Sequence, residues 1–429
     1  MTPEIKQRIE QIRRGEVPKG YKKTKAGIVP SVWYVTKLSS ISSHVTKKNA
    51  DGKVKTTFTN SATQGVIKQT DYFDKEISNK ENITGYYVVQ ENDYIYNPRI
   101  SASAPCGPIN KSHFEEQGVV SPLYTVFKMN DDMQKNRYIE FYLRSSFWHR
   151  YMCGVANYGA RHDRMNITND DLFGMPIPLP PFAEQEKIAE ILSAQDKIIE
   201  LYKRKIEKLE KLKKAYMQKM FPQKGESIPK WRFPQFTAPW EERKFGTMFK
   251  RRTKRNNGQF DNTRWISVAK MYFQESEKVS SNNIDTRTYV MRRGDIAFEG
   301  HSNAEYKYGR FVANDIGDGV ISELFPIYMH IDDYDESYWK YAIQIENIMA
   351  PKLLRCIEIS YTSSNKLDED FFLKATVLVP SISEQQQIGS YFRRMDDLIK
   401  IHQQKLDQEK QKKKALMQLL LTGIVRVNI

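Results

Sequence analysis

The sequence predicts an α/β (α+β) fold: two mixed α/β globular domains joined by two long antiparallel coiled-coil helices, as a pseudo-twofold internal repeat. Its 429 residues are too many for one ordinary hydrophobic core and suit two or three domains. A helical stretch, EQEKIAEILSAQDKII at residues 184–199, recurs at residues 384–399 as EQQQIGSYFRRMDDLI. Short β-branched and aromatic runs, separated by Gly, Asn, Pro and Ser, precede each copy and indicate strands.

The two helical stretches belong to a repeat that covers nearly the whole chain. Aligned without a gap at an offset of 200 residues, the first helix shares eleven identities with the second. Upstream, GVVSPLYTVF at Gly118 matches GVISELFPIY at Gly319, and Trp33 matches Trp240. Such self-similarity indicates an internal duplication. Each half is therefore expected to hold one globular region, here called a head, followed by one long helix.

The repeat also predicts the order of the domains. An N-terminal helical arm, residues 1–27, precedes the first head, residues 28–182, and the first long helix, residues 183–222. The second head, residues 223–382, the second long helix, residues 383–422, and a tail, residues 423–429, follow. Within the heads we expect strands at Tyr86–Gln90, Tyr94–Tyr96, Val119–Phe127 and Ile321–Ile331, and helices near Tyr138–Tyr151 and Tyr338–Leu354.

Each long helix is expected to begin directly after a strand that ends in proline. Ser383 and Gln386 have the spacing of a capping box, and Glu184 and Glu384 fall in the first turn, where the helix dipole favours an acidic residue. At 1.5 Å per residue, about 38 residues give a helix of roughly 57 Å. Such a helix is longer than a small domain is wide, so it must project from its head.

The two long helices are expected to pack on each other in antiparallel orientation. Pro222 and Gly423 mark their ends. Apolar residues of the first helix recur at steps of three, four and seven, which is typical of a helix that packs along another helix. These residues are Ile188, Ile191, Ile198, Tyr202, Leu209, Leu212, Tyr216 and Met220. A parallel pair would require the linker after Pro222 to run fully extended along the helix, at about 3.5 Å per residue.

Charge and cysteine usage narrow the function classes. A formal charge of +15 suits a protein that lies against phosphates, although a basic protein without a polyanionic partner has the same charge. Cys106, Cys153 and Cys356 lack CxxC or His-rich spacing, so we predict neither a disulfide framework nor a zinc site, but small buried thiols in a reducing cytosol. A signal-peptide pattern and a run of about 18 apolar residues are both missing, so secretion and membrane insertion are not expected.

Two similar but unequal basic heads, separated by a helical rod, suggest a way of meeting DNA. The expected rod is somewhat longer than one turn of DNA, which is about 34 to 36 Å. Two heads held at that separation can read two different half-sites on one face of a duplex and leave the base pairs between them unread.

Three segments carry a resemblance to a known family: LPPFAEQEKIAEIL at residues 179–192, VPSISEQQQIGSYF at 379–392, and GYKKTKAGIVPSVW at 20–33. With the duplicated plan, they resemble the specificity subunit of type I DNA restriction-modification systems. The resemblance implies that each head is a target-recognition domain for one half of a bipartite, asymmetric DNA site. It implies that the helices set the spacing and dock two modification (methyltransferase) subunits, to which restriction (helicase-nuclease) subunits add.

The same resemblance implies a cytoplasmic, non-catalytic subunit that binds no cofactor itself, with S-adenosylmethionine, ATP and Mg on the partner subunits. The motifs agree with it. Asn97-Pro98-Arg99-Ile100 lacks the second proline and the aromatic residue of an amino-methyltransferase motif. Residues 154–159 have phosphate-loop glycine spacing without the Lys and Ser/Thr that must follow, and neither HExxH nor EF-hand patterns occur. No catalytic or metal site is predicted.

Matching segments suggest two DNA-contacting loops in each head, whose Arg, Asn and Ser/Thr side chains suit guanine, adenine and phosphate respectively. The alternative at each position is a polar turn residue that only solvates a loop. In the first head the candidates are Asn97, Arg99, Ser101 and Ser103, then Asn157, Tyr158, Arg161, His162 and Arg164. In the second head they are His301, Ser302, Asn303, Lys307 and Arg310, then Tyr361, Thr362, Ser363, Ser364 and Lys366.

Two other functions stay open at this point. One is a self-contained DNA methyltransferase or nuclease with degenerate motifs. The other is a structural coiled-coil protein that associates with DNA without sequence specificity. Methyl transfer by the isolated chain would favour the first, and DNA binding without site preference would favour the second.

Overall fold

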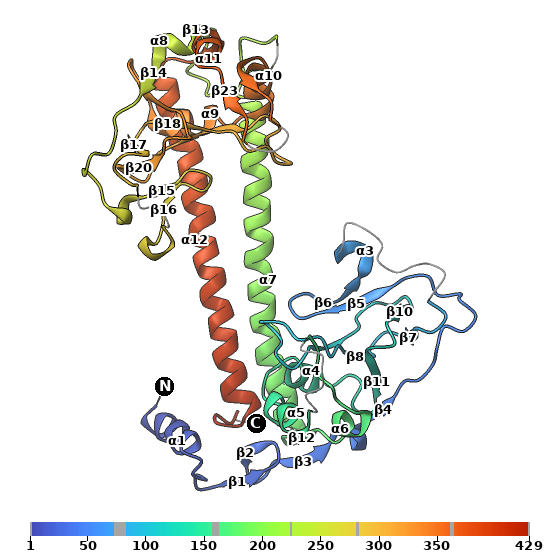
Figure 1. Cartoon of the computed structure of the whole chain (residues 1–429). Coiled ribbons are helices and arrows are strands. Elements are labelled where there is room, and N and C mark those ends of the chain that lie inside the picture. Colours follow the sequence, from blue (N-terminus) through green and yellow to red (C-terminus); the bar gives the residue numbers. More distant parts are fainter. Residues whose placement is uncertain are drawn as a thin grey trace. The chain divides into compact units, whose positions relative to one another are not determined.

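The computed structural model describes residues 2–72, 83–156, 163–223, 225–279, 283–360 and 364–427 (Figure 1). The chain divides into two compact units: unit 1 consists of residues 1–201 and 406–429, and unit 2 of residues 202–405. Unit 1 contains the first head and unit 2 the second, and each unit contains a segment of both long helices. None of the helices in the described ranges has the length and apolar character needed to span a bilayer.

Unit 1 begins with a helix and a hairpin, continues through the first head and enters the first long helix. Its elements are α1 (Pro3–Arg13), β1 (Tyr21–Thr24), β2 (Gly27–Pro30), β3 (Tyr34–Lys37), α2 (Leu38–Ile41), β4 (Ser42–His44), β5 (Phe58–Ser61), β6 (Gly65–Lys68), α3 (Gln69–Tyr72), β7 (Tyr87–Val89), β8 (Tyr94–Tyr96), β9 (Ile109–Lys111), β10 (Gly118–Val120), β11 (Thr125–Met129), α4 (Arg137–Leu143), α5 (His149–Val155), α6 (Asn169–Phe173), β12 (Pro176–Leu179) and α7 (Phe182–Lys219). The hairpin β1–β2 crosses residue 27, where the N-terminal arm was expected to end.

Unit 2 contains the second head and enters the second long helix. Its elements are β13 (Glu241–Lys244), α8 (Phe245–Met248), β14 (Phe249–Arg252), η1 (Asn262–Arg264), β15 (Ile266–Ser267), β16 (Tyr272–Phe273), η2 (Ser276–Lys278), β17 (Thr288–Met291), β18 (Ile296–Glu299), β19 (Arg310–Ala313), β20 (Gly319–Ser322), β21 (Ile327–His330), α9 (Glu336–Ala342), α10 (Glu346–Cys356), β22 (Ile357–Glu358), β23 (Lys366–Leu367), α11 (Glu369–Lys374), β24 (Thr376–Val379) and α12 (Ile382–Leu421).

The two heads share a sheet topology, which extends the internal repeat from the sequence to the structure. The first head contains the antiparallel sheet β4-β11-β8-β9, and the second contains β14-β21-β18-β19. Each head adds the pair β7–β10 or β17–β20, and the pair β3–β12 or β13–β24 that precedes a long helix. The predicted mixed α/β fold with an internal repeat is confirmed. The strands of each head form several small antiparallel sheets.

Two predicted strands are each divided by a turn. The stretch Val119–Phe127 is shared between β10 and β11, because the Tyr124 backbone N–H turns back to the Ser121 carbonyl oxygen over 3.0 Å. The stretch Ile321–Ile331 is shared between β20 and β21 in the same way. Both pieces are apolar, so the composition of the run does not reveal the turn inside it.

Both predicted head helices are also divided. The pattern near Tyr138–Tyr151 becomes α4 and α5, and the pattern near Tyr338–Leu354 becomes α9 and α10. In the first head the Ser145 hydroxyl donates a hydrogen bond of 2.6 Å to the Tyr142 carbonyl oxygen at the end of α4. A serine that bonds to the backbone in this way competes with the next helical turn.

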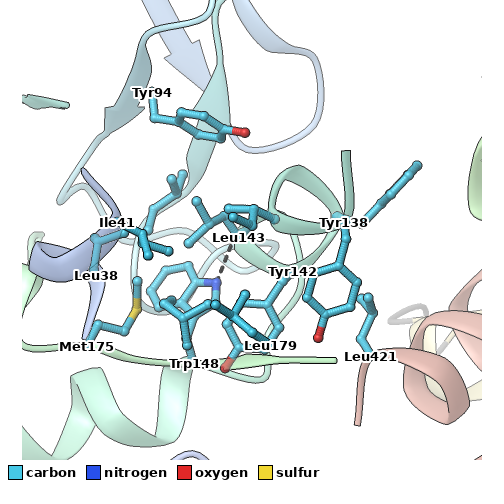
Figure 2. Packing of buried hydrophobic residues seen from close by; sticks show 14 of the residues in the cluster. Leu38, Ile41, Tyr94, Tyr138, Tyr142, Leu143, Trp148, Met175, Leu179 and Leu421 are labelled. Atoms are coloured by element: carbon cyan, nitrogen blue, oxygen red, sulfur yellow. Dashed lines mark hydrogen bonds between the residues drawn. The ribbon is translucent and has the colours of Figure 1, made fainter. Parts of the chain in front are cut away.

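Large aromatic side chains build the core of the first head, and the second long helix contributes to it. Tyr138, Tyr142 and Trp148 are at most 2% exposed, and Figure 2 shows the Trp148 indole donating to the Leu143 carbonyl oxygen over 2.8 Å. Leu421, at the end of α12, packs in the same cluster beside the two tyrosines (Figure 2). The first head is therefore completed by the helix that follows the second head.

The second head repeats this arrangement with Phe221, which the repeat aligns with Leu421. Phe221 follows α7 and is 1% exposed. Its ring meets Trp240 edge-on at a centroid distance of 5.8 Å and stacks on Tyr338 at 5.7 Å. Each head thus buries an apolar side chain from the end of the long helix that belongs to the other half of the repeat.

The two long helices pack antiparallel, as predicted. In unit 1 the Lys413 ammonium of α12 donates to the Asp196 carboxylate of α7 over 2.5 Å. In unit 2 the Lys213 ammonium of α7 donates to the Asp396 carboxylate of α12 over 2.6 Å. Because the repeat aligns Asp196 with Asp396 and Lys213 with Lys413, the same ion pair forms twice with the roles of the helices exchanged.

The long helix α12 starts one residue before the predicted position, residue 383, and its predicted cap differs. The helix begins at Ile382, directly after Ser381, so Ser383 lies inside the first turn and the predicted capping box of Ser383 and Gln386 is wrong. The Ser383 hydroxyl instead contacts the Ser381 hydroxyl at 3.1 Å. At the other end, Gly423 follows the helix with a φ of +70°, the left-handed conformation that glycine adopts most readily there.

A buried glutamate at the start of each long helix explains part of the repeated motif. Glu184 is fully buried, and the Trp33 indole of the first head donates to its carboxylate over 3.1 Å. Arg426, in the C-terminal tail, donates to the same carboxylate through Nε and Nη2, each over 2.5 Å. Since a buried carboxylate needs partners for its charge, the helix start, the head and the tail depend on one another.

Glu384 has the matching partners in unit 2. The Trp240 indole donates to its buried carboxylate over 3.3 Å, and Arg232 donates through Nε and Nη2, each over 2.7 Å. Arg232 follows α7, just as Arg426 follows α12. Each long helix is therefore fixed at its start by an arginine from the segment that follows the other long helix.

The glutamine of the repeated Glu-Gln pair joins the helix to the last strand of the head. The Gln185 side-chain amide donates to the Pro180 carbonyl oxygen over 2.7 Å, and Gln385 donates to the Pro380 carbonyl oxygen over 3.1 Å. The repeated proline, strand and Glu-Gln helix thus form one structural joint that occurs twice.

The N-terminal arm packs against the C-terminal tail within unit 1. Arg8 of α1 donates to the Ile424 carbonyl oxygen over 2.5 Å, and the Tyr21 hydroxyl of β1 donates to the Gly423 carbonyl oxygen over 2.7 Å. The Arg8 guanidinium also lies over the Tyr21 ring at 5.3 Å. These contacts hold the tail near Glu184.

Candidate DNA interface

One hairpin in each head carries the first group of candidate residues: β8–β9 in the first head and β18–β19 in the second. A Cβ at Gly107 would lie 2.0 Å from the Asn97 carbonyl oxygen, and a Cβ at Gly309 would lie 2.6 Å from the Glu299 carbonyl oxygen. Both glycines have positive φ, +75° and +83°. Only glycine suits these positions, so the two hairpins close in the same way around different side chains.

In the first head, the second candidate loop lies against this hairpin. The Met165 backbone N–H donates to the Pro98 carbonyl oxygen over 2.8 Å, and Arg99 and Arg164 face each other in an antiparallel β-bridge. The structure therefore brings together residues that are about 65 positions apart in the sequence. The two candidate loops form one surface in the described part of the first head.

The second head joins its two candidate loops through Asn365, which is 6% exposed. Its backbone N–H donates to the Gly300 carbonyl oxygen over 3.0 Å, and its side-chain amide donates to the Ser302 hydroxyl over 3.1 Å. A Cβ at Gly300 would lie 2.5 Å from the Ser364 hydroxyl, so Ser364 also touches the hairpin. Lys366 is exposed in β23 on the same loop.

Three of the first head's candidates support the hairpin. Asn97 is 8% exposed, donates to the Asn60 carbonyl oxygen over 3.0 Å and accepts from the Arg99 backbone N–H over 3.0 Å. The Ser101 and Ser103 hydroxyls contact each other at 3.2 Å across the tip. The Arg99 side chain, in contrast, is exposed. It is the basic group of this hairpin that is free to face a ligand.

Arg164 already has an acidic partner. Its Nε and Nη2 donate to the neighbouring Asp163 carboxylate over 3.3 and 3.0 Å. These hydrogen bonds from Arg164 lower the pKa of Asp163 below its ordinary value. Any DNA contact by Arg164 therefore competes with Asp163, which makes Arg99 the stronger basic candidate in the described part of this surface.

The second hairpin is organised around an acid. Glu299 is 5% exposed and contacts the His301 Nδ1 at 2.8 Å and the Arg310 Nε at 3.4 Å. Arg310 also lies over the Tyr306 ring at 4.9 Å and donates to a backbone carbonyl oxygen of the loop before β16. Burial raises the pKa of Tyr306. Arg310 thus stabilises the hairpin, and His301 is held at its exposed edge.

Asn303 and Lys307 occupy the tip of the second hairpin. The Asn303 side-chain carbonyl accepts from the backbone N–H groups of Glu305 and Tyr306, each over 2.9 Å, which closes the turn. Lys307 is exposed, with its ammonium 5.5 Å from the centre of the Tyr308 ring. Lys307 is therefore the exposed lysine of the second hairpin, as Arg99 is the exposed arginine of the first, although the two stand at different positions along their hairpins.

Seven candidates lie outside the described residues and stay predictions. They are Asn157, Tyr158, Arg161, His162, Tyr361, Thr362 and Ser363.

The structure shows a further basic element that is not among the predicted DNA-contacting residues. The pattern Thr-Lys-Lys-Asn at residues 46–49 recurs as Thr-Lys-Arg-Asn at residues 253–256. Its asparagines, Asn49 and Asn256, are each 1% exposed and bond to the loop that follows, Asn49 to the Val54 carbonyl oxygen and Asn256 to that of Phe260. Aligning the two halves on Trp33 and Trp240 would have revealed this repeat.

The basic side chains of this element stand at matching places beside the sheets. The Lys47 carbonyl oxygen accepts from the Val88 N–H over 2.9 Å, and the Lys254 carbonyl oxygen accepts from the Val290 N–H over 2.8 Å. Both lysines are exposed, whereas Arg255 is half-buried and paired with an acid. Exposed, repeated lysines of this kind suit phosphate contacts. Within the described ranges, no cluster of three metal-ligating side chains occurs.

Comparisons with a family model and with curated proteins point to the same family. Residues 30–211 match the family model described as the type I restriction modification DNA specificity domain. The type I restriction enzyme MjaVIII specificity subunit of Methanocaldococcus jannaschii is 25% identical over 378 residues, which cover 82% of this chain and 82% of the relative. The MjaX specificity subunit of the same organism is 25% identical over 316 residues, 68% of this chain and 70% of the relative.

A solved structure supports the fold. A chain from work described as the structural basis of complex assembly and conformational transition of the type I R-M system aligns with a TM-score of 0.56. The alignment covers 92% of this chain and 99% of that chain at 12% sequence identity. At this level of identity the likeness concerns the fold alone.

Proposed function

The chain belongs to the specificity subunits of type I restriction-modification systems, and we propose that its two heads read the two halves of a bipartite, asymmetric DNA site. As a member of this family it is a DNA-recognition component without catalytic activity of its own, so the degenerate-methyltransferase and coiled-coil alternatives are set aside. It works with DNA and with other subunits of a restriction-modification complex.

The observation that carries the proposal is the pair of matched hairpins with unmatched tips. Both hairpins close on a glycine that no other residue can replace, and both lie against the loop that precedes the last strand of the head. Their exposed basic residues differ: Arg99 in the first, Lys307 in the second. A conserved support with different contact residues is what two related domains need in order to read two different half-sites.

Within this surface we assign base contacts first to Arg99 and Lys307. An arginine or lysine can bond to guanine O6 and N7 in the major groove. The seven candidates outside the described residues, among them Arg161 and Tyr158, belong to the same loops and are proposed as further contacts. Lys47 and Lys254 are proposed to bind phosphates, since the charge of +15 favours a polyanionic partner.

We further propose that α7 and α12 set the gap between the half-sites and dock two modification subunits, with restriction subunits added to that core. S-adenosylmethionine, ATP and Mg would then be held by the partner subunits. A chain that acts on cellular DNA with such partners would work in the cytoplasm. The stoichiometry and the spacing role are both open to experiment.

The recognition role is tested by methylation mapping of DNA from cells that express this chain with its modification subunits. We expect a motif of two unequal halves separated by unread base pairs. Loss of the motif on deletion of the chain is the required control. A motif that persists without this chain would contradict the proposal.

The spacing role is tested by lengthening both helices where they face each other. The Tyr202 and His402 rings lie 5.9 Å apart, so seven residues inserted after each position keep the helices in register. The insertion adds about 10.5 Å, close to three base pairs at roughly 3.4 Å each. We expect a longer gap and unchanged half-sites. The same gap in both proteins would show that other contacts position the heads.

A further inference from the structure

Two of the three cysteines meet at the candidate DNA surface of the first head, although their spacing in the sequence predicts no pairing. The sulfur atoms of Cys106 and Cys153 lie 3.2 Å apart, and all three cysteines are free thiols. Cys106 belongs to the β8–β9 hairpin and is fully buried, whereas Cys153 belongs to α5 and is exposed. The expectation that Cys153 is a buried thiol is therefore wrong.

The two thiols have different chemical surroundings. Burial raises the pKa of Cys106 to about 12, and the adjacent Cys153 thiol acts in the same direction. The Cys106 thiol also donates to the His149 carbonyl oxygen over 3.7 Å. Cys153 is the sulfur that a dissolved reagent reaches first, and Cys106 is the neighbour placed to react with it second. A disulfide bond of about 2.05 Å requires the sulfurs to approach by only about 1.2 Å.

We propose that Cys106 and Cys153 form a redox-sensitive thiol pair, a modification site at which a hydroperoxide produces a reversible disulfide between the β8–β9 hairpin and α5. Nothing in the DNA-recognition role requires this site. The disulfide would link the β8–β9 hairpin, which carries the first candidate loop, to α5, which precedes the second candidate loop in the sequence.

The reaction balances as a two-electron oxidation. The Cys153 thiolate attacks one peroxide oxygen, so that an S–O bond forms, the O–O bond breaks and the alcohol or water leaves, giving a sulfenic acid. The Cys106 thiol then attacks the Cys153 sulfur, loses its proton and displaces the hydroxyl group as water. Two thiols are oxidised to one disulfide while the hydroperoxide is reduced. A cellular dithiol reverses the bond by thiol–disulfide exchange.

The closing movement falls on α5. The hairpin side is rigid, because Gly107, next to Cys106, has no room for even one added carbon beside Asn97. On the other side, a Cβ built at Gly154, next to Cys153, would meet no atom within 4 Å. The surface of α5 at Gly154 is thus open, and Asn157 to His162 follow α5 in the sequence.

The second head lacks such a pair, which gives the molecule an internal control. The third cysteine of the chain, Cys356, lies in the second head at the end of α10, the counterpart of α5, and is 2% exposed. The hairpin position that corresponds to Cys106, directly before Gly309, is Tyr308. Oxidation is therefore expected to act on the first head and to leave the second unchanged.

The modification is tested on the full chain by treatment with hydrogen peroxide, alkylation of the remaining thiols and peptide mapping without reductant. We expect a linked pair of peptides that contain Cys106 and Cys153, released by a dithiol. Cys153→Ser should abolish the link, and Cys356→Ser should leave it intact. Recovery of both cysteines as alkylated thiols, or a link formed only between two chains, would overturn the proposal.

A reagent that binds two adjacent thiols gives a second measurement, which does not depend on forming the disulfide. Phenylarsine oxide binds two adjacent thiols at once and should add one equivalent to the reduced wild-type chain and to Cys356→Ser. Modification of wild-type and Cys153→Ser chains to the same extent would contradict an adjacent pair.

The consequence for DNA rests on the proposed function. Reduced and oxidised wild-type protein are compared on duplexes with the mapped motif, with the first half-site intact or scrambled. We expect oxidation to weaken binding about tenfold, the loss of one base contact, only where the first half-site is intact. Equal binding by both forms would overturn the consequence. If the reduced protein selects no motif, the recognition role fails, while the mapped disulfide still stands.

Discussion

Compared position by position, the first and second heads agree where they join the long helices and differ at their hairpin tips. At the joints, a tryptophan of the head and an arginine from the opposite half hold the same buried glutamate, Glu184 or Glu384. At the base of the hairpins, buried Asn97 of the first head stands where buried Glu299 stands in the second, each next to a glycine with positive φ. Beyond the base, the exposed basic residue is Arg99 in the first hairpin and Lys307 in the second.

This difference separates the parts of the chain that must be kept from the parts that are free to change. A buried carboxylate with an indole and a guanidinium allows few alternatives, because a change to any one group leaves the others without a partner. The exposed side chains of Arg99 and Lys307 have no buried charge partner of this kind to lose. A duplicated gene can therefore diverge in the sequence it reads while both halves keep the same attachment to the helices.

The strongest test of the shared framework is to make the two halves identical. A fragment of residues 1–235 contains the first head, α7 and Arg232, so two copies could pair their α7 helices and exchange Arg232 onto Glu184. We expect a symmetric dimer. With modification subunits it should methylate an interrupted palindrome of the first half-site and its inverted copy. Sedimentation as a monomer, or methylation of the asymmetric site, would contradict the account.

Charge reversal supplies the matched control for this dimer. Asp196 would meet the partner's Lys213 in the fragment, as it meets Lys413 in the full chain. Asp196→Lys alone should weaken the dimer, and Asp196→Lys combined with Lys213→Asp should restore it. Restoration by the double change separates a specific pair from a general loss of stability.

The second test compares the two glutamates. Glu384→Ala leaves Arg232, whose side chain is 11% exposed, without its partner, whereas Glu184→Ala leaves Arg426, which is 35% exposed. Breaking a buried pair costs about 3 to 5 kcal/mol, and we expect a loss in this range for Glu384→Ala and a smaller loss for Glu184→Ala. Urea denaturation measures both. Equal losses in the free energy of unfolding would show that the effect of removing the glutamate does not depend on the burial of its arginine partner.

The third test compares an exposed with an engaged arginine. Arg99→Ala should weaken binding to the cognate site by about 1 to 3 kcal/mol, with less effect on random DNA and none on stability. Arg310→Ala should lower the stability instead, because the buried Glu299 loses its cationic partner. Competition binding measures the loss of affinity of both variants, and thermal unfolding measures their loss of stability. A stability loss for Arg99→Ala would reassign Arg99 to the support of the hairpin.

The smallest expected effect belongs to the repeated lysines. Lys47→Ala and Lys254→Ala should each weaken binding to cognate and random DNA equally, and should lower the slope of log affinity against log salt by about 1. Filter binding at several salt concentrations measures this slope. A selective loss of cognate binding would make these lysines readers of sequence.

The sequence predicted those features whose pattern is local or repeated. The long helices follow from apolar spacing and from the repeat of Glu184 as Glu384, and the antiparallel pairing follows from the length of the linker. Arg426 and Arg232 could not be predicted as partners of these glutamates. They follow their helices at different distances, so the repeat alignment does not match them.

The candidate surface was predicted in outline and not in detail. The corresponding loops of the two heads can be identified by aligning the two halves of the sequence. The ion pair between Arg310 and Glu299 and the burial of Asn97, in contrast, depend on how each hairpin closes. The contact between Cys106 and Cys153 joins residues on separate elements of the fold. Such contacts follow from tertiary packing, which no local pattern of residues reports.

The central claim, that each head reads its own half-site, is tested most directly by methylation mapping of two hairpin variants. One replaces residues 99–103 by glycine and serine, and the other replaces residues 301–305 and Lys307 in the same way. We expect each variant to lose sequence information in one half of the motif, and a different half in each case, with the gap unchanged. Loss in both halves, or in the same half for both variants, would contradict the claim.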